Sequence, residues 1–314
     1  MVLNISGATQ SYLADLSLTQ QQINQDTAEV SSGFRVQRPS DDPTAVASIL
    51  QTQTDIGLTQ QVQSNLSSVT SELQTADSAL QTAVQAVTTG ITVAEQGANS
   101  TSTAADRANL AQQVAGLQQT LVGISRTTYD GRYIFSGDRD TGPMYQLDAT
   151  QPNGVRQLFS VPSTRVIVDA TGTAIPVGES AQQIFDAQNP DGSGDAQGNV
   201  FAAVNSLYLA LTNTSLSSTD QQAAIAQASS SLQAASTYLN QQLASYGEAE
   251  NRVSTAADLA QKFQTQQQAQ LGNLRDADIP TVAAQLTQAQ TREQAAISAE
   301  AAVQQVKNLF SYLG

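Results

Sequence analysis

The chain has 314 residues, a formal net charge of −14 and no cysteine, histidine or tryptophan. Without Cys or His it has no thiol nucleophile, disulfide, histidine base or zinc site built on those ligands, and we expect no catalytic, cofactor or metal site. The negative charge argues against nucleic acid and anionic membranes as partners. No apolar run approaches the ~18 residues of a membrane span. Residues 1–30 lack Lys and Arg and do not read as a secretory signal peptide.

Residues 4–31 are predicted to form an amphipathic helix. Its apolar stripe repeats every seven residues, at Leu16, Ile23 and Val30. We expect the helix to end at Gly33, because glycine readily takes the left-handed conformation of a helix C-cap.

The linker that follows contains Pro39, Asp41, Asp42 and Pro43. Asp42 precedes a proline and is therefore kept out of the helical region, as an N-cap should be, while Pro43 fits the first helical position. A paired-carboxylate site for acid–base chemistry or a metal is the alternative interpretation of Asp41 and Asp42. No third ligand or base lies nearby in sequence, so the cap is favoured.

Residues 44–97 are predicted to form one long helix, whose apolar positions step by four and three without a slip. Such a seam is typical of helices that pack lengthwise on another helix. It consists of Val62, Leu66, Val69, Leu73, Ala76, Leu80, Ala83, Val87, Gly90 and Ala94. A third helix, capped by Ser102 or Thr103, is expected to run to about residue 128, and the short connection predicts antiparallel neighbours.

At Tyr129 the pattern changes to short strand-like segments rich in Gly and Pro, which predict a β-rich insert over residues 129–199. Strands are expected at 132–135, 155–159 and 165–168. The loop at 189–195 has oxygen ligands on alternate positions. It lacks the Gly and Glu that an EF-hand loop would need at 196 and 202, so a turn is favoured over a calcium site.

Helical pattern resumes at residue 200, and a second long seam then mirrors the first. It consists of Ile225, Ala228, Leu232, Ala235, Leu239, Tyr246, Ala249, Val253, Ala256, Ala260 and Phe263. The seam weakens through the Gln-rich residues 264–270, so a break is expected over 264–278. A last helix begins near Pro280, with acidic residues at its positive end. It closes in an apolar stripe at Val303, Val306, Phe310 and Leu313.

These patterns predict a mainly α fold, in which the N- and C-terminal halves form a long coiled-coil-like helical rod that carries a small β-rich insert domain. The expected domains are terminal helices at 1–43 and 275–314, a rod at 44–128 and 200–274, and the insert at 129–199. Both seams lie outside the insert, which predicts an independent module. One terminal helix pair makes a thin core, so we expect both ends to be disordered in the monomer and to pack on other subunits.

The sequence resembles the flagellin superfamily of bacterial axial proteins over residues 16–133 and 241–314. The most specific parts are Ser31–Val36 and Pro39–Pro43, together with Asp276–Asp278 and Asn308–Phe310. Asp41-Asp42-Pro43 and Asp130–Gly137 are more similar to the hook–filament junction proteins of this superfamily than to flagellins. The tail is closer to flagellin, so a short flagellin is the alternative.

The resemblance implies a structural role at the hook–filament junction of the extracellular flagellum, without catalysis. The terminal helices would form an inner tube domain, the rod the next domain and the insert the outer one. Implied partners are copies of the chain itself, a hook-associated protein, flagellin and an export chaperone, with type III export and no cleaved signal. A competing hypothesis is an enzyme using Asp138, Asp140 or Asp169, but so short a segment offers little room for a cleft.

Overall fold

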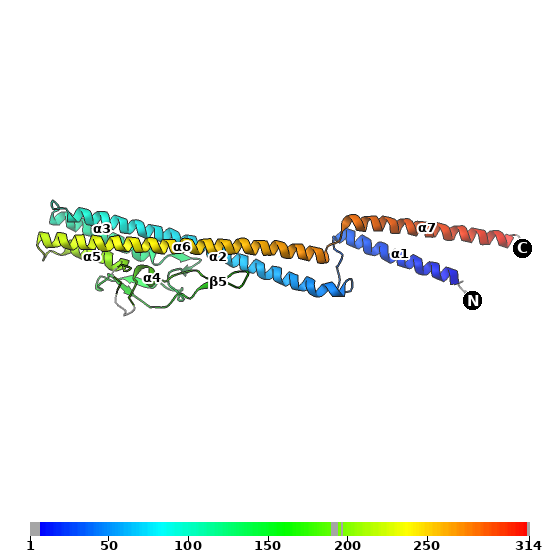
Figure 1. Cartoon of the computed structure of the whole chain (residues 1–314), viewed down its shortest axis with the longest axis horizontal. Coiled ribbons are helices and arrows are strands. Elements are labelled where there is room, and N and C mark those ends of the chain that lie inside the picture. Colours follow the sequence, from blue (N-terminus) through cyan, green and yellow to red (C-terminus); the bar gives the residue numbers. More distant parts are fainter. Residues whose placement is uncertain (1–6, 190–193, 196, 313–314) are drawn as a thin grey trace. The chain divides into compact units, whose positions relative to one another are not determined.

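The computed structural model describes residues 7–189, 194–195 and 197–312, with the side chains of residue 8 and residues 303–312 outside the description. The fold is mainly α, with a few short strand pairs, as predicted (Figure 1). Its helices are α1 (Gly7–Ser32), α2 (Pro43–Ala98), α3 (Ala104–Ile124), α4 (Ala181–Phe185), α5 (Val200–Thr212), α6 (Ser218–Arg275) and α7 (Ile279–Tyr312). The chain forms two units, residues 59–263 and residues 1–58 with 264–314, and α2 and α6 contribute to both. No described helix is apolar over the length that a bilayer crossing requires.

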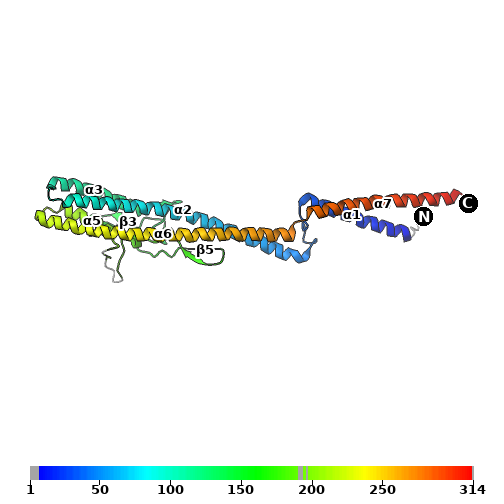
Figure 2. The same ribbon diagram turned by 45° about the horizontal axis from the view of Figure 1, so that its top comes forward.

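The larger unit is built around the two predicted seams. Within it, α2 and α6 lie side by side in both views (Figures 1 and 2). Helices α3 and α5 contact each other and share one apolar core with α2 and α6. Both seams contribute residues that are at most 1% exposed to one continuous apolar core, among them Leu66, Leu73, Leu80, Val87, Leu232, Leu239 and Val253. The seams therefore bring the N- and C-terminal halves together along one shared core.

A buried arginine ties three helix ends together at one end of this unit. Arg107 Nε donates to the carbonyl oxygen of Gly97 in α2 at 3.3 Å, and its Nη1 donates to Gln221 Oε1 at 2.5 Å. The Gln221 amide in turn donates to the last carbonyls of α5. A cation suits this place because the final carbonyls of a helix lack partners and carry the negative end of its dipole.

The turn into α3 follows the capping pattern of its sequence. Thr103 Oγ1 accepts a hydrogen bond from the Asp106 amide, and the Asp106 carboxylate accepts one from the Thr103 amide. This reciprocal capping box satisfies two free donors at the helix start. The helix ends at Ile124, earlier than the predicted residue 128, because residues 128–129 already pair in a strand.

The described part of the insert contains three separate two-stranded antiparallel ladders. The pairs are β1 (Thr128–Tyr129) with β2 (Arg132–Tyr133), β3 (Tyr145–Leu147) with β4 (Val155–Gln157), and β5 (Val166–Val168) with β6 (Ala174–Pro176). Positive φ angles at Asp130 (50°) and Gly131 (75°) make the tight turn between β1 and β2. The strands are shorter than predicted; after Tyr133, for example, the chain turns inward to bury Phe135.

The insert shares the core of the rod helices. The Phe135 ring meets Phe185 edge-on, with centroids 6.1 Å apart, and meets Tyr246 of α6 at 6.4 Å. The Arg165 guanidinium makes two hydrogen bonds to the Glu72 carboxylate of α2, at 2.7 and 2.6 Å. We therefore revise the expectation of an independent module, because apolar residues of insert and rod form a single cluster.

The break expected over residues 264–278 is much shorter in the structure. Helix α6 continues through the Gln-rich run to Arg275, and only Asp276–Asp278 separate it from α7. Glutamine is a good helix former, and Leu271 and Leu274 pack on a small core of Val36, Ala45 and Ile49. The loop considered for calcium lies partly outside the described residues.

Candidate assembly site: the terminal helix pair and its hinge

Helices α1 and α7 lie side by side in the smaller unit (Figures 1 and 2). Their facing side chains step by four and three along each helix, but few are fully covered. Among the described side chains of α7, which end at residue 302, the buried apolar ones are Val282 and Ala289. On α1, Leu16 and Ile23 are half-buried and Val30 is 36% exposed. The pair therefore has a narrow apolar seam.

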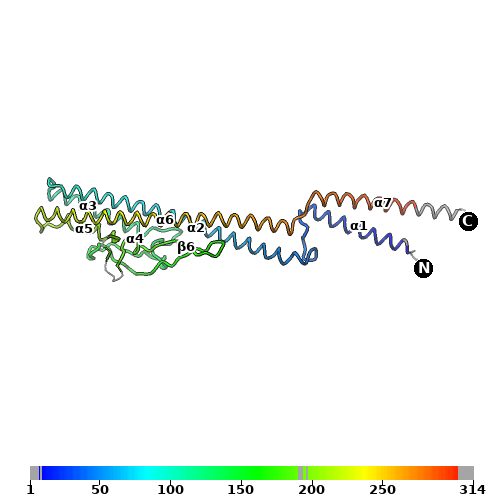
Figure 3. Tube along the Cα trace, viewed as in Figure 1, coloured from blue at the N-terminus to red at the C-terminus, as the bar shows by residue number. Residues whose placement is uncertain are grey.

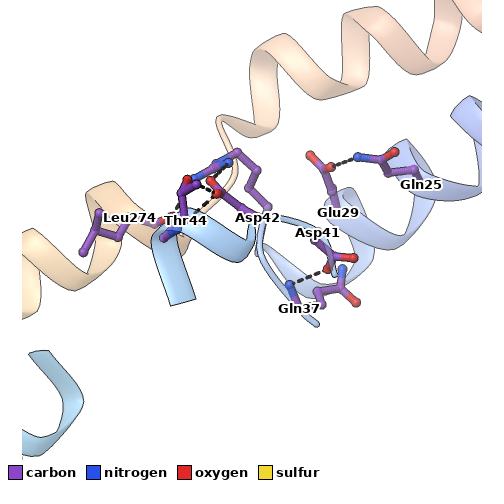
Figure 4. A network of polar contacts seen from close by, with 9 residues as sticks. Gln25, Glu29, Gln37, Asp41, Asp42, Thr44 and Leu274 are labelled. Atoms are coloured by element: carbon purple, nitrogen blue, oxygen red, sulfur yellow. Dashed lines mark hydrogen bonds and ion pairs between the residues drawn. The ribbon is translucent and has the colours of Figure 1, made fainter. Parts of the chain in front are cut away.

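Two carboxylates, which the seven-residue spacing missed, are the most buried side chains of α1. Asp26 is 2% exposed, and its Oδ1 accepts from Gln22 Nε2 at 2.8 Å, while its Oδ2 has no hydrogen-bond partner in the described chain. Glu29 accepts from Gln25 Nε2 at 3.0 Å (Figure 4). Four-and-three stepping from Ile23 would have reached Asp26. Buried carboxylates weaken a seam, since desolvating a charge is costly.

Another carboxylate, Glu293, interrupts the seam on α7, as its sequence indicated. It is half-buried, and its Oε1 accepts from Gln20 Nε2 of α1 at 3.2 Å. Polar groups at seam positions set the register of paired helices at a cost in stability. This cross-helix bond fixes the alignment of a pair that has little apolar burial.

Apolar side chains on the surface are frequent in this unit. Seven of the thirteen large exposed hydrophobic residues of the described chain belong to it, although it is the smaller unit: Leu13, Leu18, Val30, Leu50, Leu58, Ile279 and Ile297. The predicted assembly residues Val303, Val306 and Phe310 have side chains outside the description, and Leu313 lies wholly outside it. The unit thus offers apolar surface that its own fold leaves uncovered.

The linker between α1 and α2 lies next to the linker between α6 and α7 (Figure 3), and the two form an antiparallel bridge between Phe34 and Asp276. The Arg35 amide donates to the Arg275 carbonyl at 2.8 Å, and the Ala277 amide donates to the Gly33 carbonyl at 2.9 Å. Gly33 ends α1 and turns the chain toward the other linker with a φ of 77°, in the left-handed region that favours glycine. We call these paired linkers, residues 33–42 and 276–278, the hinge.

Asp42 is the N-cap of α2. Its Oδ1 accepts from the Ala45 amide at 3.1 Å and from Thr44 Oγ1 at 2.7 Å, and its Oδ2 accepts from Arg35 Nη1 at 3.0 Å (Figure 4). The bond from Thr44, followed by that from Arg35, lowers the pKa of this carboxyl to about 2. Arg35 Nη2 also donates to the Leu274 carbonyl at 2.8 Å, so the cap residue of α2 is linked to the end of α6.

Asp41 does not cap α2 but binds backbone amides of the linker itself. Its Oδ2 accepts from the backbone amides of Gln37 and Arg38, at 2.9 and 2.7 Å, which closes the linker around Pro39. These backbone hydrogen bonds, that from Arg38 first, lower the pKa of the Asp41 carboxyl. Both carboxylates are thus engaged by local donors. Within the described residues, no cluster of three acidic side chains could hold a metal ion.

Comparison with protein families finds two matches, one in each half of the chain. The bacterial flagellin N-terminal helical region matches residues 3–140, and the bacterial flagellin C-terminal helical region matches residues 229–313. A sequence comparison with proteins of curated function returned no match.

Several solved structures share the fold. A candidate flagellar hook-associated protein from Vibrio parahaemolyticus has a TM-score of 0.64 and 16% identity, over 75% of this chain and 100% of its own. Flagellar hook-associated protein 3 from Legionella pneumophila has a TM-score of 0.61 and 15% identity, over 72% and 98%. The flagellar junction protein FlgL from Legionella pneumophila has a TM-score of 0.54 and 14% identity, over 67% and 99%. Because the two flagellin regions together match most of its length, this chain belongs to the bacterial flagellin family.

Proposed function

We propose that this chain is a structural protein of the bacterial flagellum that joins a hook-associated protein to the flagellin filament by ordered self-association. One observation carries the proposal: in the smaller unit of this flagellin-family chain, the helix pair α1–α7 has a narrow apolar seam and leaves several apolar side chains exposed. The likeness to hook-associated protein 3 and to FlgL supports the junction position. No catalytic step is part of this function.

In this proposal the terminal helices, residues 1–43 and 275–314, form the inner tube domain and order only on assembly. Ordering costs roughly 1–2 kcal/mol of backbone entropy per residue, and the α1–α7 seam offers few buried apolar groups against it. Asp26 weakens the seam further. Neighbouring subunits would supply the missing core at Leu16, Ile23 and Val30 and at the apolar tail of α7, as partners do for segments that fold on binding.

The rod at 44–128 and 200–274 and the insert at 129–199 would lie further out and keep the monomer folded before assembly. Their shared core is independent of the terminal pair. Before export through the flagellar type III apparatus, an export chaperone would cover the terminal helices, since exposed apolar stripes favour unwanted association. The mature protein would then be extracellular.

A deletion strain tests the proposal. Loss of a junction protein should leave complete hooks, visible by electron microscopy, while intact flagellin accumulates in the culture medium. Restoring the gene should return the filaments and clear the medium.

A short flagellin is the alternative, favoured by the Asp276–Ile279 segment and the closing apolar tail. If this chain were the sole flagellin, its deletion would leave hooks with no flagellin in the medium. That result would contradict the junction role.

A further inference from the structure

The hinge carries a groove of about 420 Å³ beside the first turns of α2. Its apolar lining includes the buried Val36 and Ile49, and Leu50, which is 58% exposed. Within the described chain, the charged residues that line it are Arg38 and Arg275, and no carboxylate does so. In a chain of net charge −14, this makes the groove an unusual patch of apolar and positive character.

The two arginines differ in what they already bind. The Arg275 guanidinium lies 3.9 Å from the centroid of the Phe34 ring, and its Nε donates to Asp276 Oδ1 at 3.2 Å. Arg38 is exposed, and its guanidinium forms none of the ion pairs found among the described residues. The nearby Asp41 is occupied by two backbone amides. Arg38 is therefore the cation available to a visiting carboxylate.

The complementary surface lies on α1, at Asp15 and Leu18. These residues are one turn apart and share a face of the helix. Leu18 is 63% exposed, and the exposed Asp15 carboxylate makes no ion pair in the described chain. A leucine beside a carboxylate matches Leu50 beside Arg38. Opposite charges at this point would offset the general repulsion between two acidic copies.

We propose that the Asp15–Leu18 turn of one copy docks into the hinge groove of a second copy, with Leu18 on Leu50 and Asp15 on Arg38. The proposal rests on the proposed function and specifies its self-association. Leu18 lies about 21 Å before the end of α1 at ~1.5 Å per residue, too far along the helix to reach the groove of its own copy. The contact is heterologous, so it repeats from copy to copy around a ring or along a helix.

Disulfide cross-linking tests this contact cleanly, because the chain has no cysteine of its own. A variant with Leu18→Cys and Leu50→Cys is made the only copy in the cell, and isolated flagella are oxidised and run on a non-reducing gel. A ladder of dimers and higher oligomers is expected, since each copy offers both positions. Each single variant should give no ladder. The matched control carries Leu18→Cys with Leu58→Cys, because Leu58 is about as exposed as Leu50 but does not line the groove. A disulfide needs Cα atoms within ~7 Å, so this control should give no ladder.

A charge exchange gives a second readout in the same cross-linking variant. Asp15→Arg alone and Arg38→Asp alone should each lower the yield of the ladder roughly fivefold, and the two together should restore it. Flagella that contain the protein but show no ladder, or show Leu50→Cys linked to a different protein, would overturn this inference and leave the proposed function intact. Absence of the protein from isolated flagella would contradict both.

Discussion

Replacing Phe135 by alanine tests whether the insert and the rod are one folding unit. The Phe135 ring is fully buried between Phe185 of α4 and Tyr246 of α6. Its backbone carbonyl also accepts from the Ala181 amide at 2.6 Å, so the surrounding chain is fixed and cannot easily close over a cavity. Loss of a buried phenylalanine ring costs about 3–5 kcal/mol.

For a folding unit of this size, ~1 kcal/mol shifts the thermal midpoint by about 2–4 °C. Phe135→Ala should therefore lower the midpoint by roughly 6–20 °C, measured by circular dichroism at 222 nm, where the helices give most of the signal. Phe159→Ala is the matched control, because Phe159 is only partly buried at the edge of the same core. It should cost less than half as much.

The result that would refute this reasoning is a helical transition that Phe135→Ala leaves unchanged. Local melting of the insert, detected by tyrosine fluorescence, would then precede it. Such a separation would mean that the rod holds its fold without the insert. The observed core, shared by apolar residues of both, would then contribute little to the stability of α2 and α6.

Three further perturbations probe the seam, the buried arginine and the hinge. Leu73→Asp should destabilise the monomer by several kcal/mol because it buries an unpaired charge, whereas Gln74→Asp should change its stability by roughly 0.5 kcal/mol or less; equal losses of thermal midpoint would contradict the seam register. Arg107→Leu should cost about 2–4 kcal/mol in urea unfolding, since it strands buried carbonyl and amide groups, and a neutral effect would contradict its role at the helix ends. The lowered pKa of Asp42 means that its carboxylate stabilises the folded hinge above its ordinary pKa, and this contribution is lost as the pH falls through about 2. In the assembled protein, where the hinge is ordered, the chemical shift of the Ala45 amide should titrate with that midpoint, and a midpoint near the ordinary 3.8 would contradict the cap geometry.

The long helices and their pairing were predictable because a seam is a local repeat. The apolar spacing of α2 and α6 repeats about every two turns, and residues at the predicted seam positions, such as Leu73 and Leu239, are buried in the structure. The capping residue Asp42 was predictable for a similar reason, since a cap depends on its immediate neighbours. Flagellin-like ends were visible in the same local motifs.

Features that join distant segments left no such pattern. The hydrogen bonds of Arg35 and Gly33 to residues 275–277 join backbone groups. Almost every residue type has these groups, so the bonds leave no mark in the sequence. The shared core of rod and insert depends on single aromatic residues such as Phe135, which a seam search does not detect. Asp26 continues the four-and-three stepping of Ile23, but it is a carboxylate and so is not part of the apolar repeat.

The terminal helices are expected to stabilise the assembly and barely to stabilise the monomer. A chain that ends at Ala299 tests this division most directly, because it lacks the apolar tail at Val303, Val306, Phe310 and Leu313. Its thermal midpoint should match that of the full-length monomer within about 3 °C, no more than the shift that ~1 kcal/mol produces in a unit of this size. In cells it should fail to join hooks or filaments. A truncated chain that melts much earlier, or that still assembles, would contradict this division of labour.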